Sequence, residues 1–319
     1  MKDIILYGDC RETIKKITSP IQTCVTSPPY YGLRDYGGEE SQIGQEQTPE
    51  EYIDELVKVF REVRNKLNDD GTLWVNIGDS YYNYRPSNKG KSYVKQTLAK
   101  TSQDLPSHSS KRNNKLSNYK EKDLIGIPFM LAFALRNDGW YLRQDIIWHK
   151  PNPMPESVKD RCTKSHEYIF LLSKNKKYYY DNEAIKEPVK QDWGTRNRTK
   201  GKYHNTGSGL SPHSGLTKSY DRKNKRDVWS VTNKPYKQAH FAVFPPDLIE
   251  PCILAGSKEG DIVLDPFMGS GTTAMVAKQH NRHYIGCELH DNYKDLIEQR
   301  VPVEEPSQVI DNPLTQMLY

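Results

Sequence analysis

The sequence predicts an α/β fold with a Rossmann-like, mostly parallel, twisted sheet that carries helices on both faces. Three observations lead to this prediction. Short apolar segments with strand character alternate with helical patterns along the chain, as in sheets whose parallel strands are joined by helices. Residues 261–289 contain a compact strand, a glycine-rich turn, a helix and a second strand. The 319 residues are enough for one large core with insertions.

The first part of the chain contains three expected strands and one helix. Residues 3–8 form a short apolar strand, and residues 23–30 form a second strand that ends at two prolines, because proline cannot donate to a ladder. A helix begins at Pro49 and stops near residues 68–71. Its apolar residues recur at helical spacing: Tyr52, Leu56, Val59, Phe60, Val63 and Leu67. Residues 71–79 (GTLWVNIGD) form the third strand.

The second part alternates in the same way. We expect helices over 127–137 and 246–255 and a strand over 140–153 that prolines end. The sequence EYIFLLSKNKKYYYD at 167–181 predicts a hairpin with Asn175 near its turn. The strand, turn, helix and strand of the carboxyl-terminal unit complete the expected sheet.

Two polar segments without core periodicity interrupt this pattern. Residues 84–120 hold nine Lys or Arg and one Asp, and residues 186–237 hold 13 Lys or Arg and four acidic residues. The whole chain has a net charge of only +5, so the rest of the molecule is acidic. Basic segments on an acidic body are typical of proteins that grip a phosphate backbone. Charge alone leaves open that both are solvated loops.

The sequence also disfavours several classes of protein. It contains no run of 18 apolar residues, and its amino terminus becomes polar too early for a signal peptide, so we expect neither a membrane protein nor a secreted one. Five cysteines are scattered singly, which favours the reducing cytosol: Cys10, Cys24, Cys162, Cys252 and Cys287. The sequence HEYIF at His166 lacks the second histidine of a zinc HExxH motif. We therefore expect a cytoplasmic, nucleoid-associated protein without a metal.

The carboxyl-terminal unit has the chemistry of a ligand site. Asp265 stands at the end of its first strand, and Gly269 and Gly271 allow the tight bend before the helix. Ligands of open parallel sheets bind beyond such strand ends. The second strand ends in Glu288, whose carboxylate can accept both hydrogens of a ribose diol. Neither GxxxxGK[ST] nor GxGxxG is present, which disfavours a triphosphate or a nicotinamide ligand.

The second chemically specific feature is Thr26-Ser27-Pro28-Pro29-Tyr30 at a strand end. A rigid turn followed by an aromatic core residue would explain it without function. The functional interpretation starts from an exocyclic amine on a base, which is a poor nucleophile because its lone pair is delocalised into the ring. The Ser27 hydroxyl and the Pro28 carbonyl can accept the amino hydrogens, and Tyr30 can stack on the base.

Together these features resemble the amino-methylating DNA methyltransferases. TSPPY resembles motif IV of that family, and DPFMGSGTT resembles its S-adenosylmethionine loop. The catalytic motif precedes the cofactor loop, an order similar to the circularly permuted β class. Residues 8–10 (GDC), 148–153 (WHKPNP) and 240–245 (HFAVFP) resemble further elements of the family.

The resemblance implies a role for each matching residue. The catalytic residues would be Ser27, Pro28, Pro29 and Tyr30. The cofactor-binding residues would be Asp9, Cys10, Phe244, Asp265, Pro266, Phe267, Gly269, Ser270, Gly271, Thr272 and Glu288, with Asp9 on the adenine amino group and Glu288 on the ribose. The cofactor would be S-adenosylmethionine and the product S-adenosylhomocysteine.

The resemblance also implies a domain organisation. The catalytic half of one methyltransferase domain would span residues 1–80 and 124–182, and the cofactor-binding half 237–319. A basic loop insertion would occupy 81–123, and a target-recognition region would occupy 183–236.

The expected partner is double-stranded DNA with the target base flipped out of the duplex. Candidate DNA contacts lie after the catalytic turn, beside the base pocket and in the second basic segment: Tyr31, Arg34, His149, Lys150, Arg196, Arg198, Arg222 and Arg226. A homodimer and a separate cognate restriction endonuclease are further possible partners.

The target base is the least determined point. Within the family, serine before Pro-Pro is associated with cytosine N4, whereas adenine enzymes usually have Asp or Asn there. We therefore expect a cytosine-N4 methyltransferase, with adenine N6 as the alternative. A DNA-binding protein that has lost catalysis is the alternative of another class, and the intact TSPPY sequence speaks against it.

Overall fold

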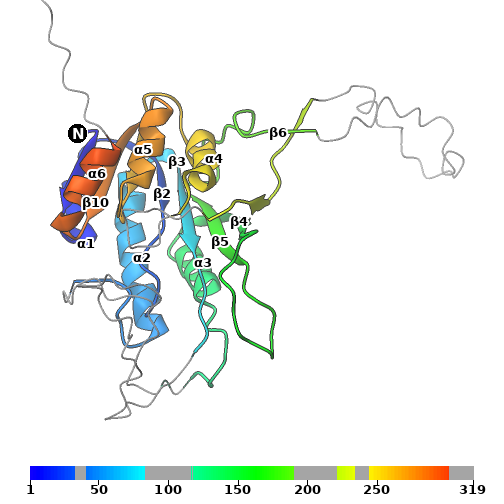
Figure 1. Cartoon of the computed structure of the whole chain (residues 1–319). Helices are drawn as coiled ribbons and strands as arrows, with labels where there is room; N and C mark the ends of the chain where they lie inside the picture. Colours follow the sequence, from blue (N-terminus) through cyan, green and yellow to red (C-terminus); the bar gives the residue numbers. More distant parts are fainter. Residues whose placement is uncertain (33–40, 83–115, 117, 190–220, 234–243, 302–319) are drawn as a thin grey trace, which may run out of the picture.

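An eight-stranded sheet forms the centre of the molecule in the computed structural model, which describes residues 1–32, 41–82, 116, 118–189, 221–233 and 244–301. The strand order is β1-β10-β9-β2-β3-β5-β4-β8 (Figure 1). The strands are β1 (Ile4–Tyr7), β2 (Ile21–Thr26), β3 (Leu67–Ile77), β4 (Tyr141–His149), β5 (His166–Ser173), β8 (Val228–Ser230), β9 (Ile262–Asp265) and β10 (His283–Glu288). The first five strands in this order are parallel, β5 is antiparallel to both neighbours, and β8 is parallel to β4. The prediction of a mostly parallel sheet is confirmed.

Helices cover both faces, as expected. One face packs against α1 (Cys10–Thr13), α2 (Pro49–Lys66) and α3 (Ile127–Asn137), and the other against α4 (Pro246–Gly256), α5 (Thr272–Gln279) and α6 (Lys294–Arg300). Successive side chains of a strand point to opposite faces. Accordingly Cys24 joins the first core and Val25 the second. Figure 1 shows α4 and α5, in yellow and orange, side by side on one face.

Helix α2 forms where its sequence predicts it. Thr48 and Glu51 make a reciprocal capping box, and Pro49 occupies the first turn, where its missing N–H is no loss. The apolar stripe of the helix is buried, with Tyr52 and Leu56 both 0% exposed. In the part of the chain that the structure describes, no helix is both long and apolar enough to cross a membrane.

The structure corrects three details of the predicted elements. The hairpin over 167–181 was wrong: β5 pairs with β4, whereas Tyr179 donates a backbone hydrogen bond to Asp70 and Tyr180 stacks on Trp74. The third strand, expected over residues 71–79, already begins at Leu67 and ends at Ile77.

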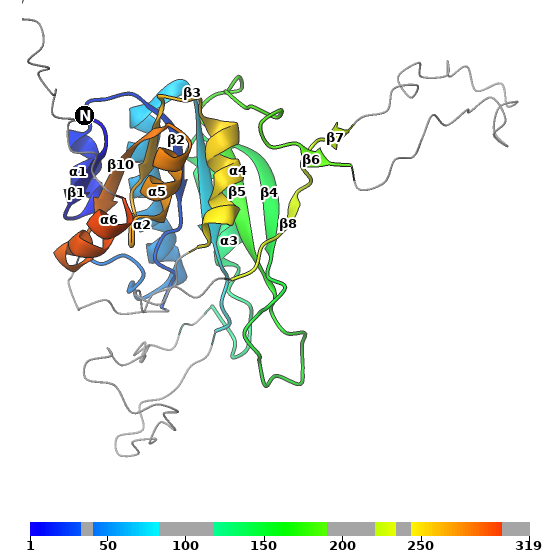
Figure 2. The same cartoon turned by 45° about the horizontal axis from the view of Figure 1, so that its top comes forward.

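The third correction concerns the second polar segment, which adds β8 to the main sheet because Trp229 is buried against the second core (Figure 2). It also contributes the two-stranded pair β6 (Glu187–Pro188) and β7 (Arg222–Lys223). Helices α1 and α6 were not predicted.

Candidate active site

The candidate site lies at one edge of the sheet. Because β1, β10, β9, β2 and β3 are parallel neighbours, their carboxyl ends meet at the same edge. The residues that end these strands or directly follow them are, in that order, Gly8 and Asp9, Glu288, Asp265, Ser27, and Gly78. The turn at residues 27–30, named the catalytic turn for its predicted role, and the glycine-rich loop at residues 266–271 therefore follow adjacent strands, β2 and β9.

A buried carboxylate joins these two turns. The Thr26 hydroxyl donates to Asp265 Oδ1 over 2.6 Å, and the Thr273 hydroxyl donates to Oδ2 over 2.6 Å. The Phe267 N–H also donates to Oδ1, over 3.0 Å. Burial raises the pKa of Asp265 to about 6, and these hydrogen bonds act against that rise. Asp265 is only 1% exposed. Its carboxylate connects the catalytic turn, the loop and α5 through these three hydrogen bonds.

Glu288 holds the glycine-rich loop from the neighbouring strand. Its Oε2 accepts from the Gly269 N–H over 2.8 Å, and its Oε1 accepts from the His290 N–H over 3.0 Å. Burial raises the pKa of Glu288 to about 7, whereas the backbone hydrogen bonds lower it. The Gly8 N–H donates to the Glu288 carbonyl over 2.8 Å, which ties the end of β1 to the same point.

The start of α5 carries a polar atom for which the described part of the chain supplies no partner. The Thr272 hydroxyl is buried and receives no hydrogen bond from any described residue. Gly271 precedes it with φ +80°, and a Cβ there would lie 3.3 Å from Ile297 of α6. An N-terminal helix turn attracts anionic groups. A buried hydroxyl at such a turn fits the carboxylate end of an amino acid ligand.

Arg300 supports this loop and was not among the predicted site residues. It comes from α6 and donates to the Ser270 hydroxyl over 2.7 Å. Ser270 itself is 3% exposed, so its hydroxyl supports the loop. No sequence signal separates Arg300 from other surface arginines, because the loop and α6 meet only in the folded chain.

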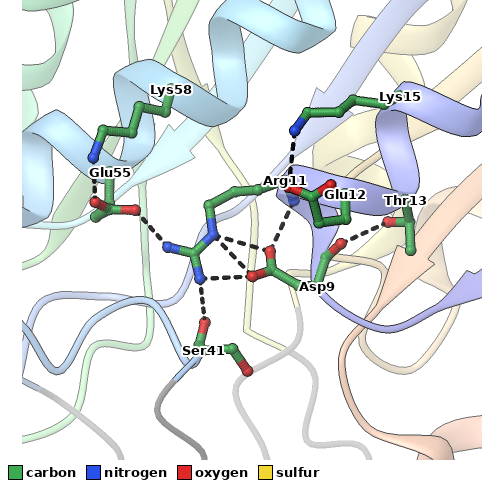
Figure 3. A network of polar contacts seen from close by, with 8 residues as sticks. All are labelled: Asp9, Arg11, Glu12, Thr13, Lys15, Ser41, Glu55 and Lys58. Carbon is green, nitrogen blue, oxygen red and sulfur yellow. Dashed lines mark hydrogen bonds and ion pairs between the residues drawn. The ribbon is translucent and has the colours of Figure 1, made fainter.

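Asp9 follows β1, the edge strand of the sheet, and lies within a polar network (Figure 3). Its Oδ1 accepts from the Arg11 N–H over 2.8 Å and so caps α1. The Arg11 guanidinium pairs with Asp9 and with Glu55 of α2, and it also donates to the Ser41 carbonyl over 3.1 Å. Arg11 therefore connects the expected adenine contact to the segment that follows the catalytic turn. Cys10 is buried at 7% exposure, so its thiol faces the core.

The two carbonyls of the Pro-Pro turn differ in their surroundings. The Pro29 carbonyl accepts a 2.8 Å hydrogen bond from the hydroxyl of Tyr52, which is fully buried in α2. No described residue donates to the Pro28 carbonyl. The Pro28 oxygen is therefore an acceptor of this turn that the described residues leave unused, next to the Ser27 hydroxyl.

Tyr30 is held by residues of β3 and β5 and by Gly78, directly after β3. Its hydroxyl donates to Glu167 Oε2 over 2.8 Å and lies 3.4 Å from Asn76 Oδ1. Its ring packs on Gly78, where an added Cβ would lie 2.7 Å from the ring. Glu167 also forms an ion pair with Lys150. Glu167, Asn76 and Gly78 were not among the predicted site residues.

Comparison with known proteins places this geometry in a family. Residues 21–299 match the profile of the N6/N4 DNA methylases, described as DNA methylase. The chain is 47% identical over 298 residues to type II methyltransferase M.SmaI of Serratia marcescens, covering 93% of this chain and 90% of that protein. It is 45% identical over 307 residues to M.Cfr9I of Citrobacter freundii, covering 94% and 88%. The chain belongs to the N6/N4 DNA methylase family.

Solved structures share the fold of this DNA methyltransferase. The PvuII DNA methyltransferase, titled cytosine-N4-specific, superposes with a TM-score of 0.61 at 19% identity, covering 96% of this chain and 89% of that one. A putative DNA modification methylase from Thermus thermophilus, complexed with S-adenosylmethionine, gives 0.55 at 23% identity and covers 93% and 92%. The fold of this chain is thus one that solved DNA methyltransferases share.

The residues expected at the methyltransferase's cofactor and DNA surfaces fall into three groups. Pro266, Gly271 and Thr272 are buried in the loop, while Phe244, Phe267 and Gly269 are partly exposed. Arg222 and Arg226 are exposed and bind the Lys186 carbonyl and Glu187. Arg34, Arg196 and Arg198 lie outside the described residues.

Three expected DNA contacts are engaged by the protein itself. Tyr31 is 3% exposed and donates its hydroxyl to the Gln47 carbonyl, which argues against direct contact with DNA. His149 Nδ1 lies 3.0 Å from the Ser230 hydroxyl. Lys150 pairs with Glu167 and lies 4.2 Å from the centre of the Trp148 ring. Among the described residues no cluster of His, Cys, Asp or Glu could hold a metal ion.

Proposed function

We propose that this enzyme transfers a methyl group from S-adenosylmethionine to N4 of a flipped cytosine at a specific site in duplex DNA. The observation that carries the proposal is the Thr26–Asp265 hydrogen bond of 2.6 Å, which fixes the catalytic turn beside the glycine-rich loop. A methyl donor in that loop and an amine at the turn would lie at adjacent strand ends.

The residues at the loop fit S-adenosylmethionine. The buried Thr272 hydroxyl and the first turn of α5 suit the amino acid end of the cofactor. Glu288 Oε1 and Oε2 each accept one backbone hydrogen bond, and a carboxylate oxygen has a further lone pair for a ribose hydroxyl. When bound, the cofactor supplies an electrophilic methyl group on a sulfonium.

The catalytic turn activates the amine by hydrogen bonding. The Ser27 hydroxyl and the Pro28 carbonyl accept the two amino hydrogens, which withdraws the nitrogen lone pair from the ring and directs it at the methyl group. Tyr30 stacks on the base and holds its plane. The amine held by Ser27 and Pro28 would take up the methyl group that the bound cofactor supplies, leaving its thioether product, and would then lose one proton to solvent.

Ser27 favours cytosine N4 as the target, and adenine N6 is the alternative. The family resemblance associates serine at this position with cytosine N4. A neutral hydroxyl is a weaker acceptor than a carboxylate, but hydrogen-bond strength alone does not select the base. Both reactions use the same acceptors, so the choice depends on the shape of the base pocket.

The test is expression in a host that lacks DNA methylation. Mass spectrometry of hydrolysed DNA should detect N4-methyldeoxycytidine, and long-read sequencing should place it in one recurrent motif. N6-methyldeoxyadenosine in its place would favour the alternative. Ser27→Ala should abolish the modification while S-adenosylmethionine still binds, and unchanged methylation by this variant would remove Ser27 from the mechanism.

The same proposal includes the partners of the enzyme. Residues 183–236, with exposed Arg222 and Arg226, form the target-recognition region, and arginines there can read guanine. The two bacterial relatives are type II methyltransferases by name. The proposal therefore includes a homodimer and a cognate restriction endonuclease that acts separately. It places the enzyme in the cytoplasm, associated with the nucleoid.

A further inference from the structure

Glu167 is a charged residue at the first positions of a buried strand. It follows His166 in the sequence HEYIF, which lacks the pattern of a zinc site. Because β5 runs antiparallel to β3, the start of β5 lies beside the end of β3, and Tyr168 pairs with Ile77. This topology brings Glu167 to the catalytic turn, 137 positions away from Tyr30 in the sequence.

Three donors converge on the Glu167 carboxylate. Oε2 accepts from the Tyr30 hydroxyl over 2.8 Å and from Asn76 Nδ2 over 3.3 Å. Oε1 receives the Lys150 ammonium. The Glu167 and Lys150 side chains are 15% and 17% exposed. A carboxylate this deep in the protein is stable only when paired and hydrogen-bonded.

Lys150 and Asn76 hold the Glu167 carboxylate in place independently of Tyr30. Lys150 follows β4 and lies over the Trp148 ring, and Asn76 donates to the Tyr168 carbonyl over 3.1 Å. Both are therefore anchored by the sheet. The carboxylate they hold in place offers a fixed acceptor to the Tyr30 hydroxyl.

Two constraints then determine where the Tyr30 ring lies. The hydroxyl bond to Glu167 fixes one end of the ring, and the absence of a side chain at Gly78 lets the ring lie against β3. Burial and the Glu167 charge raise the pKa of Tyr30 well above its usual value, with nearby Ser27 acting against them. The phenol is therefore a neutral hydrogen-bond donor, and it lies near the catalytic serine.

We infer that Glu167 is a positioning residue for methyl transfer, acting through Tyr30 to hold a stacking surface for the target base beside Ser27. This inference rests on the proposed function. A tyrosine that is already in place loses less conformational freedom when the base arrives, so Glu167 improves the productive binding of DNA and leaves binding of the cofactor unchanged. Immobilising one free side chain on binding weakens it by about two- to tenfold.

The experiment is a double-mutant cycle between the two residues. The substrate is a duplex oligonucleotide with the motif that sequencing of expressing cells identifies. Tyr30→Phe removes only the hydroxyl, and Glu167→Ala removes its acceptor. We expect Tyr30→Phe to lower kcat/KM for DNA by about fivefold in the native background and to have no further effect in the Glu167→Ala background. Glu167→Gln, which keeps an acceptor oxygen, should restore most of the loss.

Controls separate positioning from folding. Glu12→Gln breaks an exposed Glu–Lys pair with Lys15 and should behave as the native enzyme. The KM for S-adenosylmethionine should be unchanged in Tyr30→Phe. If Glu167→Ala does not fold, Glu167→Leu combined with Lys150→Met serves as the background, because removing both charges together leaves neither unpaired.

The outcomes are distinct. An equal effect of Tyr30→Phe in both backgrounds would show that Glu167 does not act through Tyr30, and the inference would be wrong. Glu167→Gln as impaired as Glu167→Ala would also overturn it. A native enzyme that methylates no DNA would instead reject the proposed function, since no activity would exist for Glu167 to influence.

Discussion

Acidification from pH 8 to pH 6 should weaken binding of the nucleoside part of the cofactor through protonation of Glu288. Burial raises the pKa of Glu288 to about 7, so the carboxylate is ionised above this pH and protonated below it. A ribose diol donates two hydrogen bonds, and an ionised carboxylate accepts them better. With a pKa of about 7, roughly nine-tenths of the group is ionised at pH 8 and one-tenth at pH 6. We therefore expect affinity to fall by up to about tenfold across this range.

The assay is calorimetric titration with 5′-methylthioadenosine. This probe has the adenine and ribose of the cofactor but lacks its amino acid group, so the ligand itself does not titrate in the range. Binding to Glu288→Gln should be weaker at pH 8 and independent of pH. Glu298→Gln, which removes an exposed acid on neighbouring α6, is the matched control and should keep the native pH profile.

Two results would refute the reasoning about Glu288. Affinity of the native enzyme that does not change with pH would show that the carboxylate does not face the ribose. A native pH profile retained by Glu288→Gln would assign the titration to another group. The range stays at or above the pKa of Asp265, which burial raises to about 6, so Asp265 contributes only at the acidic end.

Three substitutions test the frame of the site. Thr26→Val removes a 2.6 Å donor to Asp265, and urea unfolding at pH 8 should show a free energy of unfolding lower by about 1–3 kcal/mol. An unchanged free energy of unfolding would mean that this hydrogen bond does not stabilise the protein. Gly78→Ala places a Cβ 2.7 Å from the Tyr30 ring, so kcat/KM for DNA should fall severalfold with little change in melting temperature, and native turnover would contradict the packing. Arg11→Met leaves two carboxylates without their shared cation and should destabilise the protein by about 1–3 kcal/mol at low salt; a variant as stable as the native protein would show that this network is not holding α1 against α2.

Local sequence signals predicted the parallel part of the sheet well. Strands β1, β2, β9 and β10 are short apolar segments bounded by residues that end a strand. Helix α2 carries both a cap and an apolar stripe. These features depend on neighbouring residues, so the sequence expresses them directly. The TSPPY turn and the glycine-rich loop lie at adjacent strand ends, joined by the Thr26–Asp265 bond.

The misplaced elements depend on contacts between distant segments. The three tyrosines at 178–180 have strong strand propensity, but Tyr180 packs on Trp74 and Tyr178 on Arg143 instead of forming a ladder. Strand β8 is only three residues long, and its place is set by Trp229. Tertiary packing outweighs β propensity in such cases.

The two loops of the candidate site carry recognisable sequence motifs, whereas the residues that hold these loops in place do not. Glu167, Asn76 and Arg300 reach the catalytic turn or the cofactor loop from strands and helices far along the chain. Each is an ordinary polar residue in its own segment, so periodicity and motif spacing do not mark it. Conversely, Tyr31 follows the motif directly and is buried, because adjacency in sequence does not determine which way a side chain points.

The two buried carboxylates at the cofactor edge also imply a link between ligand binding and stability. Burial raises the pKa of Asp265 from 3.8 to about 6 and that of Glu288 from 4.5 to about 7. For acids with a raised folded-state pKa, stability is fully present below the unfolded pKa and is lost as pH rises through the folded pKa. Each group therefore costs on the order of 3 kcal/mol above neutral pH.

Asp265 and Glu288 differ in what a ligand can do for them. Asp265 already has three protein donors, whereas Glu288 has two backbone donors and can accept more. A ligand that donates to Glu288 lowers its pKa and recovers part of the cost, and this gain is realised at a pH where the group is ionised. The rise in melting temperature caused by 5′-methylthioadenosine should therefore be larger at pH 8 than at pH 6, and this difference should disappear in Glu288→Gln. An equal rise at both pH values in the native enzyme would show that Glu288 gains nothing from the ligand and holds the loop alone.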